Sequence, residues 1–114
     1  MPLYQYVALR AAKAWNGNAN CALVVGATAP EALRAVRGLV GDMPILVPGV
    51  GAQSGDLDAV LDACLTRSGA GLMVNASRSI IFASSGPDYA ACARREAERL
   101  HGAMAAHISG KHDQ

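Results

Sequence analysis

The sequence has little charge and no long apolar run. Charged residues make up 17% of the 114 positions and the net charge is only +1, so a basic groove for nucleic acid is not expected. No apolar stretch approaches the roughly 18 residues that a membrane helix requires, and Met1 is not followed by a basic-then-apolar signal segment. These absences predict a cytosolic protein that binds neither nucleic acid nor a membrane.

Cysteine and histidine are too sparse to predict a metal site. The cysteines lie far apart among apolar residues and lack the close spacing of zinc ligands, so we interpret them as buried free thiols. The histidines are not grouped as a ligand set, and we interpret them as residues of a solvated helix face or a tail. These residues are Cys21, Cys64, Cys92, His101, His107 and His112.

Apolar residues are abundant, at 52%, and they alternate between two kinds of segment. Short apolar runs at 21–26, 43–49 and 71–77 predict strands buried on both faces, and a helical pattern follows each run. This alternation is typical of βα units around a parallel sheet. The predicted helices are residues 3–15, 29–40, 56–65 and 88–106, with Thr28 as a candidate cap and with Tyr6 and Trp15 packed inside.

The chain length fits a single domain, structured over residues 1–108 and followed by a frayed tail at 109–114. Three strands flanked by helices leave two parallel edges unpaired, and parallel strands normally lie within larger covered sheets. The sequence therefore predicts an incomplete unit, which either associates with copies of itself or forms a section of a larger barrel.

A glycine-rich segment, PGVGAQ at 48–53, begins at the end of the second predicted strand. Gly49 and Gly51 allow unusual backbone conformations and a close approach of backbone N–H groups to a ligand. The segment matches neither the nucleotide P-loop nor the dinucleotide-binding pattern. From these residues alone, both a plain turn and an anion-binding loop remain open.

Polar residues NASR, at 75–78, end the third predicted strand. They place Arg78 at the carboxyl end of the sheet, beside the glycine-rich segment. A guanidinium group is a fork-shaped donor suited to phosphate, and barrels commonly bind phosphate at the loops after their last two strands. A surface salt bridge of Arg78 is the alternative that the residues leave open.

Three segments together resemble a known family: VVGAT at 24–28, MPILVPGVGAQSGD at 43–56 and GLMVNASRSIIFAS at 71–84. They are similar to the last three βα units of orotidine 5'-phosphate decarboxylase, in particular its mycobacterial-type branch. The resemblance implies an α/β fold that is part of a (β/α)8 TIM barrel. It also implies a homodimer that converts orotidine monophosphate to uridine monophosphate and carbon dioxide in pyrimidine biosynthesis, without a metal or organic cofactor.

The resemblance also implies roles for five residues in binding the substrate. Gln53 would reach the phosphate and Arg78 would bind it as a charged fork. The backbone N–H groups of Gly51, Ser77 and Arg78 would contact the remaining phosphate oxygens, and Pro48 would border the pyrimidine.

The family's catalytic motif, D-x-K-x-x-D, is absent from this chain. Its two lysines are Lys13 and Lys111, and neither has an aspartate two residues before it. We therefore assign no catalytic residue and expect the chain alone to be inactive, with a missing N-terminal portion or a second copy as partner. A free-standing phosphate-binding or self-assembling module without catalysis remains the alternative, while the pairing of PGVGAQ with NASR disfavours other phosphate-binding barrels.

Overall fold

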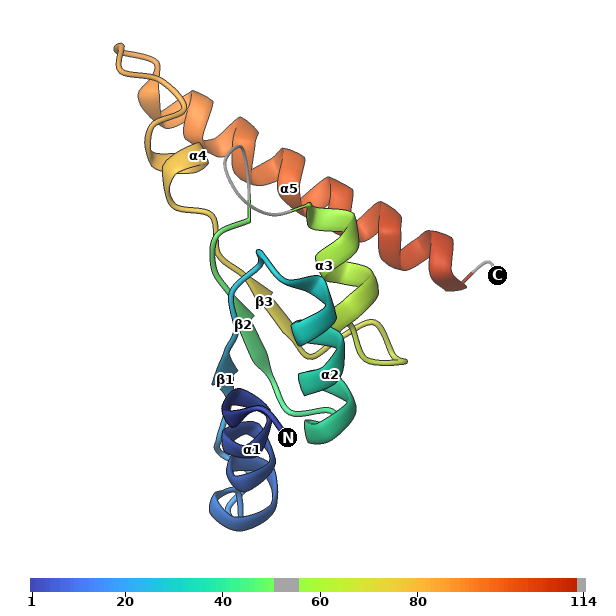
Figure 1. Ribbon diagram of the computed structural model, residues 1–114. Coiled ribbons are helices and arrows are strands. Elements are labelled where there is room, and N and C mark those ends of the chain that lie inside the picture. The colour runs from blue at the N-terminus through green and yellow to red at the C-terminus, as the bar shows by residue number, and fades with distance from the viewer. Residues whose placement is uncertain (51–55, 113–114) are drawn as a thin grey trace.

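The computed structural model describes residues 1–50 and 56–112, and these form an α/β unit around a parallel sheet (Figure 1). The described strands are β1 (Leu23–Val24), β2 (Ile45–Val47) and β3 (Leu72–Val74), in the order β1-β2-β3. Both pairings are parallel. The predicted arrangement of βα units around a parallel sheet is thereby confirmed.

Helices precede or follow each strand, as the sequence predicts. The first helix, α1, continues into a π-helical turn, η1, and a short helix, α4, lies in a segment that the sequence predicts to be a loop. The helical elements are α1 (Leu3–Arg10), η1 (Ala11–Trp15), α2 (Pro30–Val40), α3 (Leu57–Cys64), α4 (Arg78–Ile81) and α5 (Tyr89–His112).

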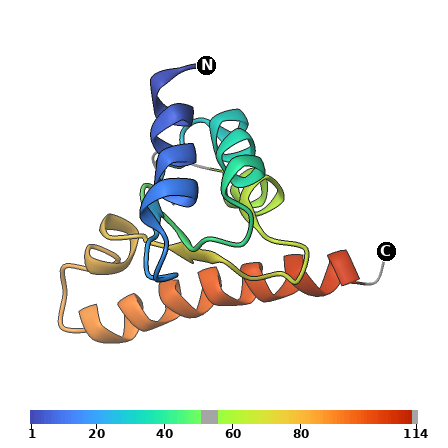
Figure 2. The same cartoon turned by 90° about the horizontal axis from the view of Figure 1, so that it is seen from below.

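One face of the sheet packs against α2 and α3, which lie side by side on it (Figures 1 and 2). Ile45 and Val47 are fully buried on this face. They share the core with the apolar stripe of α2, which the sequence predicts at Leu33, Val36 and Val40. Each such side chain contributes about 1.5–3 kcal/mol when it is fully removed from water. The core therefore fixes the two helices on the sheet.

The opposite face of the sheet is exposed in this chain. Val24 of β1 is 68% exposed and Met73 of β3 is 47% exposed. Both residues are register partners of Leu46 in β2. Side chains alternate between the two faces of a strand, so these residues point away from α2 and α3. The prediction of strands buried on both faces is thus wrong for the chain as described.

Small side chains hold α1 against the rest of the unit. Ala8 and Ala11 are buried, whereas Tyr6 and Trp15 are 53% and 57% exposed. The prediction that these two aromatic residues pack inside is wrong, because α1 contacts α2 through the face that carries its alanine side chains.

Two helix ends differ from the sequence-based expectation. The N-cap of α2 is Ala29, without a side-chain hydrogen bond, so Thr28 does not cap it; Pro30 at the first helical position instead favours the start of the helix. The last helix, α5, runs to His112 and includes residues expected in the tail. Ser109 and Gly110 weaken a helix but do not forbid one.

Arg37 joins the turns at the amino ends of the strands. Its guanidinium group donates to the carbonyl oxygens of Cys64 at 2.6 Å, Gly41 at 2.7 Å, Met43 at 2.6 Å and Gly71 at 2.7 Å. Hydrogen bonds from a charged donor are worth about 1.5–3 kcal/mol each. Arg37 therefore stabilises the end of the sheet opposite to the proposed ligand site. Among the helices of the described residues, none is long and apolar enough to cross a bilayer.

Candidate functional site

The carboxyl ends of the strands are joined by backbone hydrogen bonds. The N–H of Asn75 donates to the carbonyl oxygen of Val47 at 3.1 Å, and the N–H of Ala27 donates to that of Pro48 at 3.2 Å. These bonds extend the ladder beyond the strands themselves. The segments that follow β2 and β3 therefore leave the sheet at the same rim, as the sequence predicts.

The segment after β2 is described as far as Val50. Pro48 is half-buried, Gly49 is exposed and Val50 is 5% exposed. Gly49 has a φ of +83°, a conformation that glycine adopts at little cost and other residues rarely adopt. The predicted ligand residues Gly51 and Gln53 lie outside the described residues, so the structure places one of the three predicted residues of this loop, Pro48.

The segment after β3 turns directly into α4. The side-chain amide of Asn75 donates to the hydroxyl of Ser77 at 3.2 Å, and Ser77 occupies the N-cap position of α4. Arg78 is the first residue of α4 rather than the last residue of the strand, and both Ser77 and Arg78 are exposed. The two predicted ligand residues are thus adjacent at the rim from which Pro48 departs.

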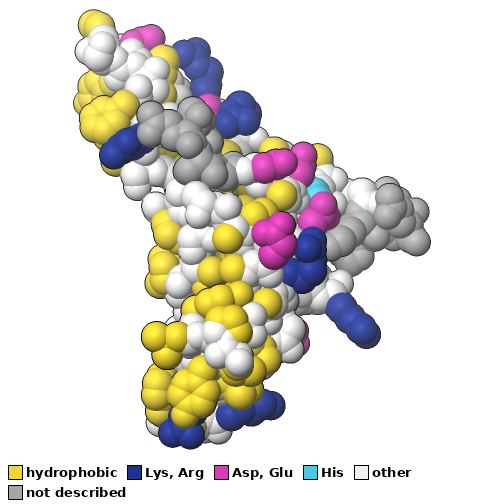
Figure 3. Space-filling model, in the orientation of Figure 1, with side chains coloured by type: hydrophobic (Ala, Val, Ile, Leu, Met, Phe, Trp, Pro, Cys, Tyr) yellow, Lys and Arg dark blue, Asp and Glu magenta, His cyan; other side chains and the backbone are white. Residues whose placement is uncertain are grey.

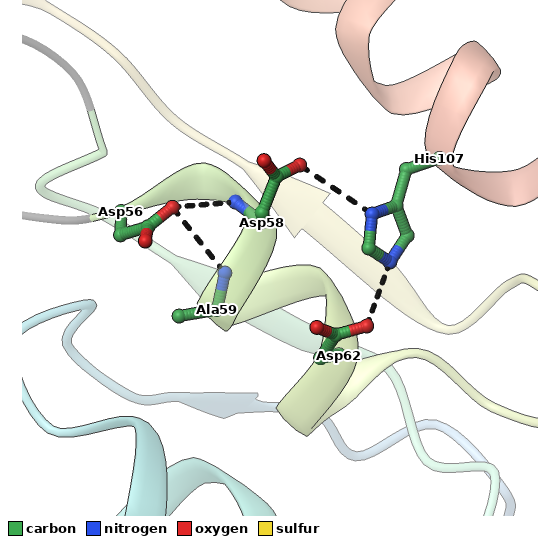
Figure 4. A network of polar contacts seen from close by, with 5 residues as sticks. All are labelled: Asp56, Asp58, Ala59, Asp62 and His107. Carbon is green, nitrogen blue, oxygen red and sulfur yellow. Dashed lines mark hydrogen bonds and ion pairs between the residues drawn. The ribbon is translucent and has the colours of Figure 1, made fainter.

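The helix that follows the glycine-rich segment, α3, has Asp56 as its N-cap residue. The Oδ1 atom of Asp56 accepts from the N–H of Asp58 at 2.9 Å and from that of Ala59 at 3.4 Å (Figure 4). A carboxylate at this position satisfies free N–H groups and interacts favourably with the helix dipole. Asp56, the first residue of the predicted helix at 56–65, is therefore the N-cap residue of α3.

His107 lies in an environment that the sequence does not predict. Its side chain is only 16% exposed and lies between the carboxylates of Asp58 and Asp62 on α3 (Figure 4). The prediction of a solvated position is therefore wrong. The spacing of four between the two aspartates signals a shared helix face, but nothing in the sequence pairs that face with a histidine on α5.

The cysteines are all free. Cys64 is fully buried, whereas Cys21 and Cys92 are half-buried, so the prediction of buried thiols holds for one of the three. Burial raises the pKa of the Cys64 thiol, although the nearby Arg37 lowers it in part. Within residues 1–50 and 56–112, no three histidine, cysteine or acidic side chains are placed to share a metal ion.

An apolar cleft of about 540 Å³ lies between α1, β1 and α2. It opens beside Val24, on a strand that pairs with β2. Apolar side chains gather over this end of the molecule, around α1 (Figure 3). The residues that line the cleft include Leu3, Tyr4, Val7, Leu23 and Val24. The cleft and the exposed sheet face together form a large apolar surface.

No protein-family model matches the sequence. The chain is 55% identical over 100 residues to an orotidine 5'-phosphate decarboxylase of Cellvibrio japonicus, a match that covers 88% of this chain and 37% of that protein. It is 49% identical over 108 residues to an orotidine 5'-phosphate decarboxylase of a Janthinobacterium species, covering 95% and 40%. The chain thus spans well under half the length of these curated relatives.

Solved structures agree with the sequence matches. The fold is similar to that of Leishmania donovani UMP synthase, with a TM-score of 0.73, 43% identity and coverage of 90% of this chain and 22% of that one. The match to Leishmania donovani OMP decarboxylase has a TM-score of 0.71 and 39% identity, covering 90% and 38%. The predicted resemblance, including a partial barrel fold, is confirmed over this region.

Proposed function

The chain corresponds to one segment of the orotidine 5'-phosphate decarboxylases, and from this premise we propose that it supplies the phosphate-binding side of such an active site. The reaction replaces the carboxylate of orotidine monophosphate by a proton, giving uridine monophosphate and carbon dioxide. The supporting observation is the bond between Asn75 and Val47, because it brings the segments after β2 and β3 to one rim. We expect the activity in the cytosol.

In this proposal, the residues at the rim bind different parts of the nucleotide. The guanidinium of Arg78 donates to two phosphate oxygens, which is the geometry that suits a planar fork. The backbone N–H groups of Gly51, Ser77 and Arg78 donate to the remaining oxygens, and the Gln53 side chain reaches the phosphate. Pro48 borders the pyrimidine. Binding energy from the phosphate can then be used to orient the reacting carbon.

The proton donor for the reaction must come from outside this chain. Lys13 lies in η1 and Lys111 near the end of α5, so neither lysine follows a strand at the rim. We therefore propose that the chain does not catalyse decarboxylation by itself. A lysine and paired carboxylates from other strands of a barrel would complete the site.

The apolar surface supports a proposal about where the rest of such a barrel would pack. Val24 and Met73 are exposed on the sheet face, and the apolar cleft adjoins β1. Burying such a surface is favourable at about 25 cal/mol per Å². We propose that further strands of a barrel cover this face and pair with β1, and that association of two copies is the competing outcome.

Reconstitution tests the proposal. The chain would be mixed with the N-terminal portion of the Cellvibrio japonicus relative, and orotidine monophosphate decarboxylation would be followed. We expect turnover only in the mixture, reduced about 100-fold by Arg78→Ala because the phosphate loses a charged, paired donor. The control is Arg67→Ala, which removes an exposed arginine from the turn before β3, at the other end of the strand. Turnover by the chain alone, or an unchanged rate in the Arg78 variant, would contradict the proposal.

A further inference from the structure

We propose that Asn75 is a positioning residue for the phosphate site: its side-chain amide orients the Ser77 hydroxyl, and this hydroxyl donates a hydrogen bond to the nucleotide phosphate. The inference rests on the proposed function, in which Ser77 binds the phosphate through its backbone N–H alone. It adds one neutral side-chain donor to the site and one residue that holds this donor in place.

The sheet fixes the position of Asn75. Its backbone N–H donates to the carbonyl oxygen of Val47 at 3.1 Å, so its backbone extends the parallel ladder at the rim. Side chains on regular elements are held more precisely than side chains on loops. The amide of Asn75 therefore starts from a fixed point beside Val47, the residue that precedes Pro48.

The amide of Asn75 and the hydroxyl of Ser77 form a directed pair. The Nδ2 atom of Asn75 donates to Oγ of Ser77 at 3.2 Å. The nitrogen of an amide is a donor only, so Oγ of Ser77 is the acceptor in this pair. A hydroxyl group also carries one hydrogen, which the pair does not use. The Ser77 hydroxyl is thus left to donate to another acceptor.

The helix that begins here does not use this hydroxyl either. Ser77 is the N-cap residue of α4 with a φ of −88° and a ψ of −59°, and its side chain makes no cap hydrogen bond. By contrast, the carboxylate of Asp56, at the same position of α3, accepts from two backbone N–H groups. Within residues 1–50 and 56–112, the bond from Asn75 is the one hydrogen bond of the Ser77 side chain.

Exposure and location make the hydroxyl available to a ligand. Asn75 and Ser77 are both exposed, and Ser77 directly precedes Arg78, the residue proposed to bind the phosphate with a positive charge. Phosphate oxygens are strong acceptors, and hydrogen bonds from O–H groups to anionic oxygens are short and strong. A donor to Oγ of Ser77 polarises its O–H bond and strengthens this donation. The pair therefore complements the guanidinium with a neutral donor.

A double-mutant cycle on affinity tests the inference. Calorimetry would compare the unmutated chain, Asn75→Ala, Ser77→Ala and the double variant in their affinity for uridine monophosphate and for uridine. We expect Ser77→Ala to weaken nucleotide binding about fourfold and Asn75→Ala about threefold, with the affinity for uridine unchanged. The double variant should lose about fourfold rather than about twelvefold, because Asn75 acts only through Ser77.

Asn75→Asp tests the direction of the bond. A carboxylate can only accept, so it would draw the hydrogen of the Ser77 hydroxyl away from the phosphate. The carboxylate also repels the phosphate, and the Ser77→Ala background measures this repulsion alone. We expect Asn75→Asp to lower nucleotide affinity more than Asn75→Ala does, and the excess to shrink in the Ser77→Ala background. An equal excess in both backgrounds would overturn the proposed orientation of the hydroxyl.

Three controls accompany the cycle. Ser77→Thr keeps a hydroxyl group and should retain nucleotide affinity within about twofold. Ser85→Ala removes an exposed hydroxyl from the segment between α4 and α5 and should retain the full affinity. Because Asn75 and Ser77 are exposed, their alanine variants should unfold at the same urea concentration as the unmutated chain.

The outcomes separate this inference from the proposed function. If uridine monophosphate binds no more tightly than uridine, the phosphate site fails and the inference fails with it. If Arg78→Ala abolishes the preference for the nucleotide while Ser77→Ala leaves it unchanged, the proposed function stands and the inference is overturned. Additive losses in the cycle, or equal losses for the nucleotide and for uridine, would overturn the positioning role of Asn75.

Discussion

The backbone N–H of Asn75, the first residue after β3, donates to the carbonyl oxygen of Val47, the last residue of β2, at 3.1 Å. The bond continues the parallel ladder by one step beyond the strands. As a result, the segment that begins at Pro48 and the segment that contains Ser77 and Arg78 start from neighbouring points. This relationship is the geometric basis of the proposed phosphate site.

Two glycine substitutions should change stability in opposite directions. Gly71 has a φ of +77°, and an added Cβ would lie 2.7 Å from Cγ2 of Thr66, so Gly71→Ala should destabilise the chain by about 1–3 kcal/mol. Gly38 lies inside α2 with nothing within 4 Å of an added Cβ, so Gly38→Ala should stabilise it by about 0.5–1 kcal/mol. Urea unfolding measures both changes, and equal effects would contradict the described turn.

Replacing Arg37 should destabilise the chain at the amino ends of the strands. Arg37→Met keeps much of the side-chain volume but removes the donors to four carbonyl groups, and we expect a loss of about 2–4 kcal/mol in the free energy of unfolding. The control Arg34→Met, at an exposed position on the same helix, should change it by less than about 0.5 kcal/mol. Equal losses in the two variants would show that the carbonyl contacts contribute little.

The three thiols should differ in reactivity. Cys64 is fully buried, and burial raises the pKa of its thiol, so it carries little of the reactive thiolate in the folded chain. Cys21 and Cys92 are half-buried. A thiol reagent followed by mass spectrometry should modify these two first, and Cys64 only when urea unfolds the chain. Modification of Cys64 at the rate of Cys21 in the native state would disprove its burial.

The fold was predictable where local patterns decide it. The apolar stripe at Leu33, Val36 and Val40 predicts the buried face of α2, and Asp56 predicts the start of α3. The apolar run containing Val24 was misread because it predicts burial on both faces, whereas one face of the sheet is exposed in this chain. A sequence pattern indicates which apolar side chains favour burial, but it does not indicate which other segment packs against them.

The site was predictable only in part. The order of the strands implies that Pro48 and Arg78 lie at one rim, since carboxyl ends of neighbouring parallel strands share an edge. The start of α4 at Arg78 was missed because four residues are too few to produce a helical pattern. The contact of His107 with Asp58 and Asp62 depends on how α5 packs on α3, which no local pattern encodes.

The most direct test of the central claim is the affinity of the chain for uridine monophosphate compared with uridine, measured by calorimetry. The account predicts that the nucleotide binds at least about tenfold more tightly, and that Arg78→Ala removes most of this difference while Arg67→Ala preserves it. Equal affinity of the unmutated chain for the two ligands would contradict the phosphate site.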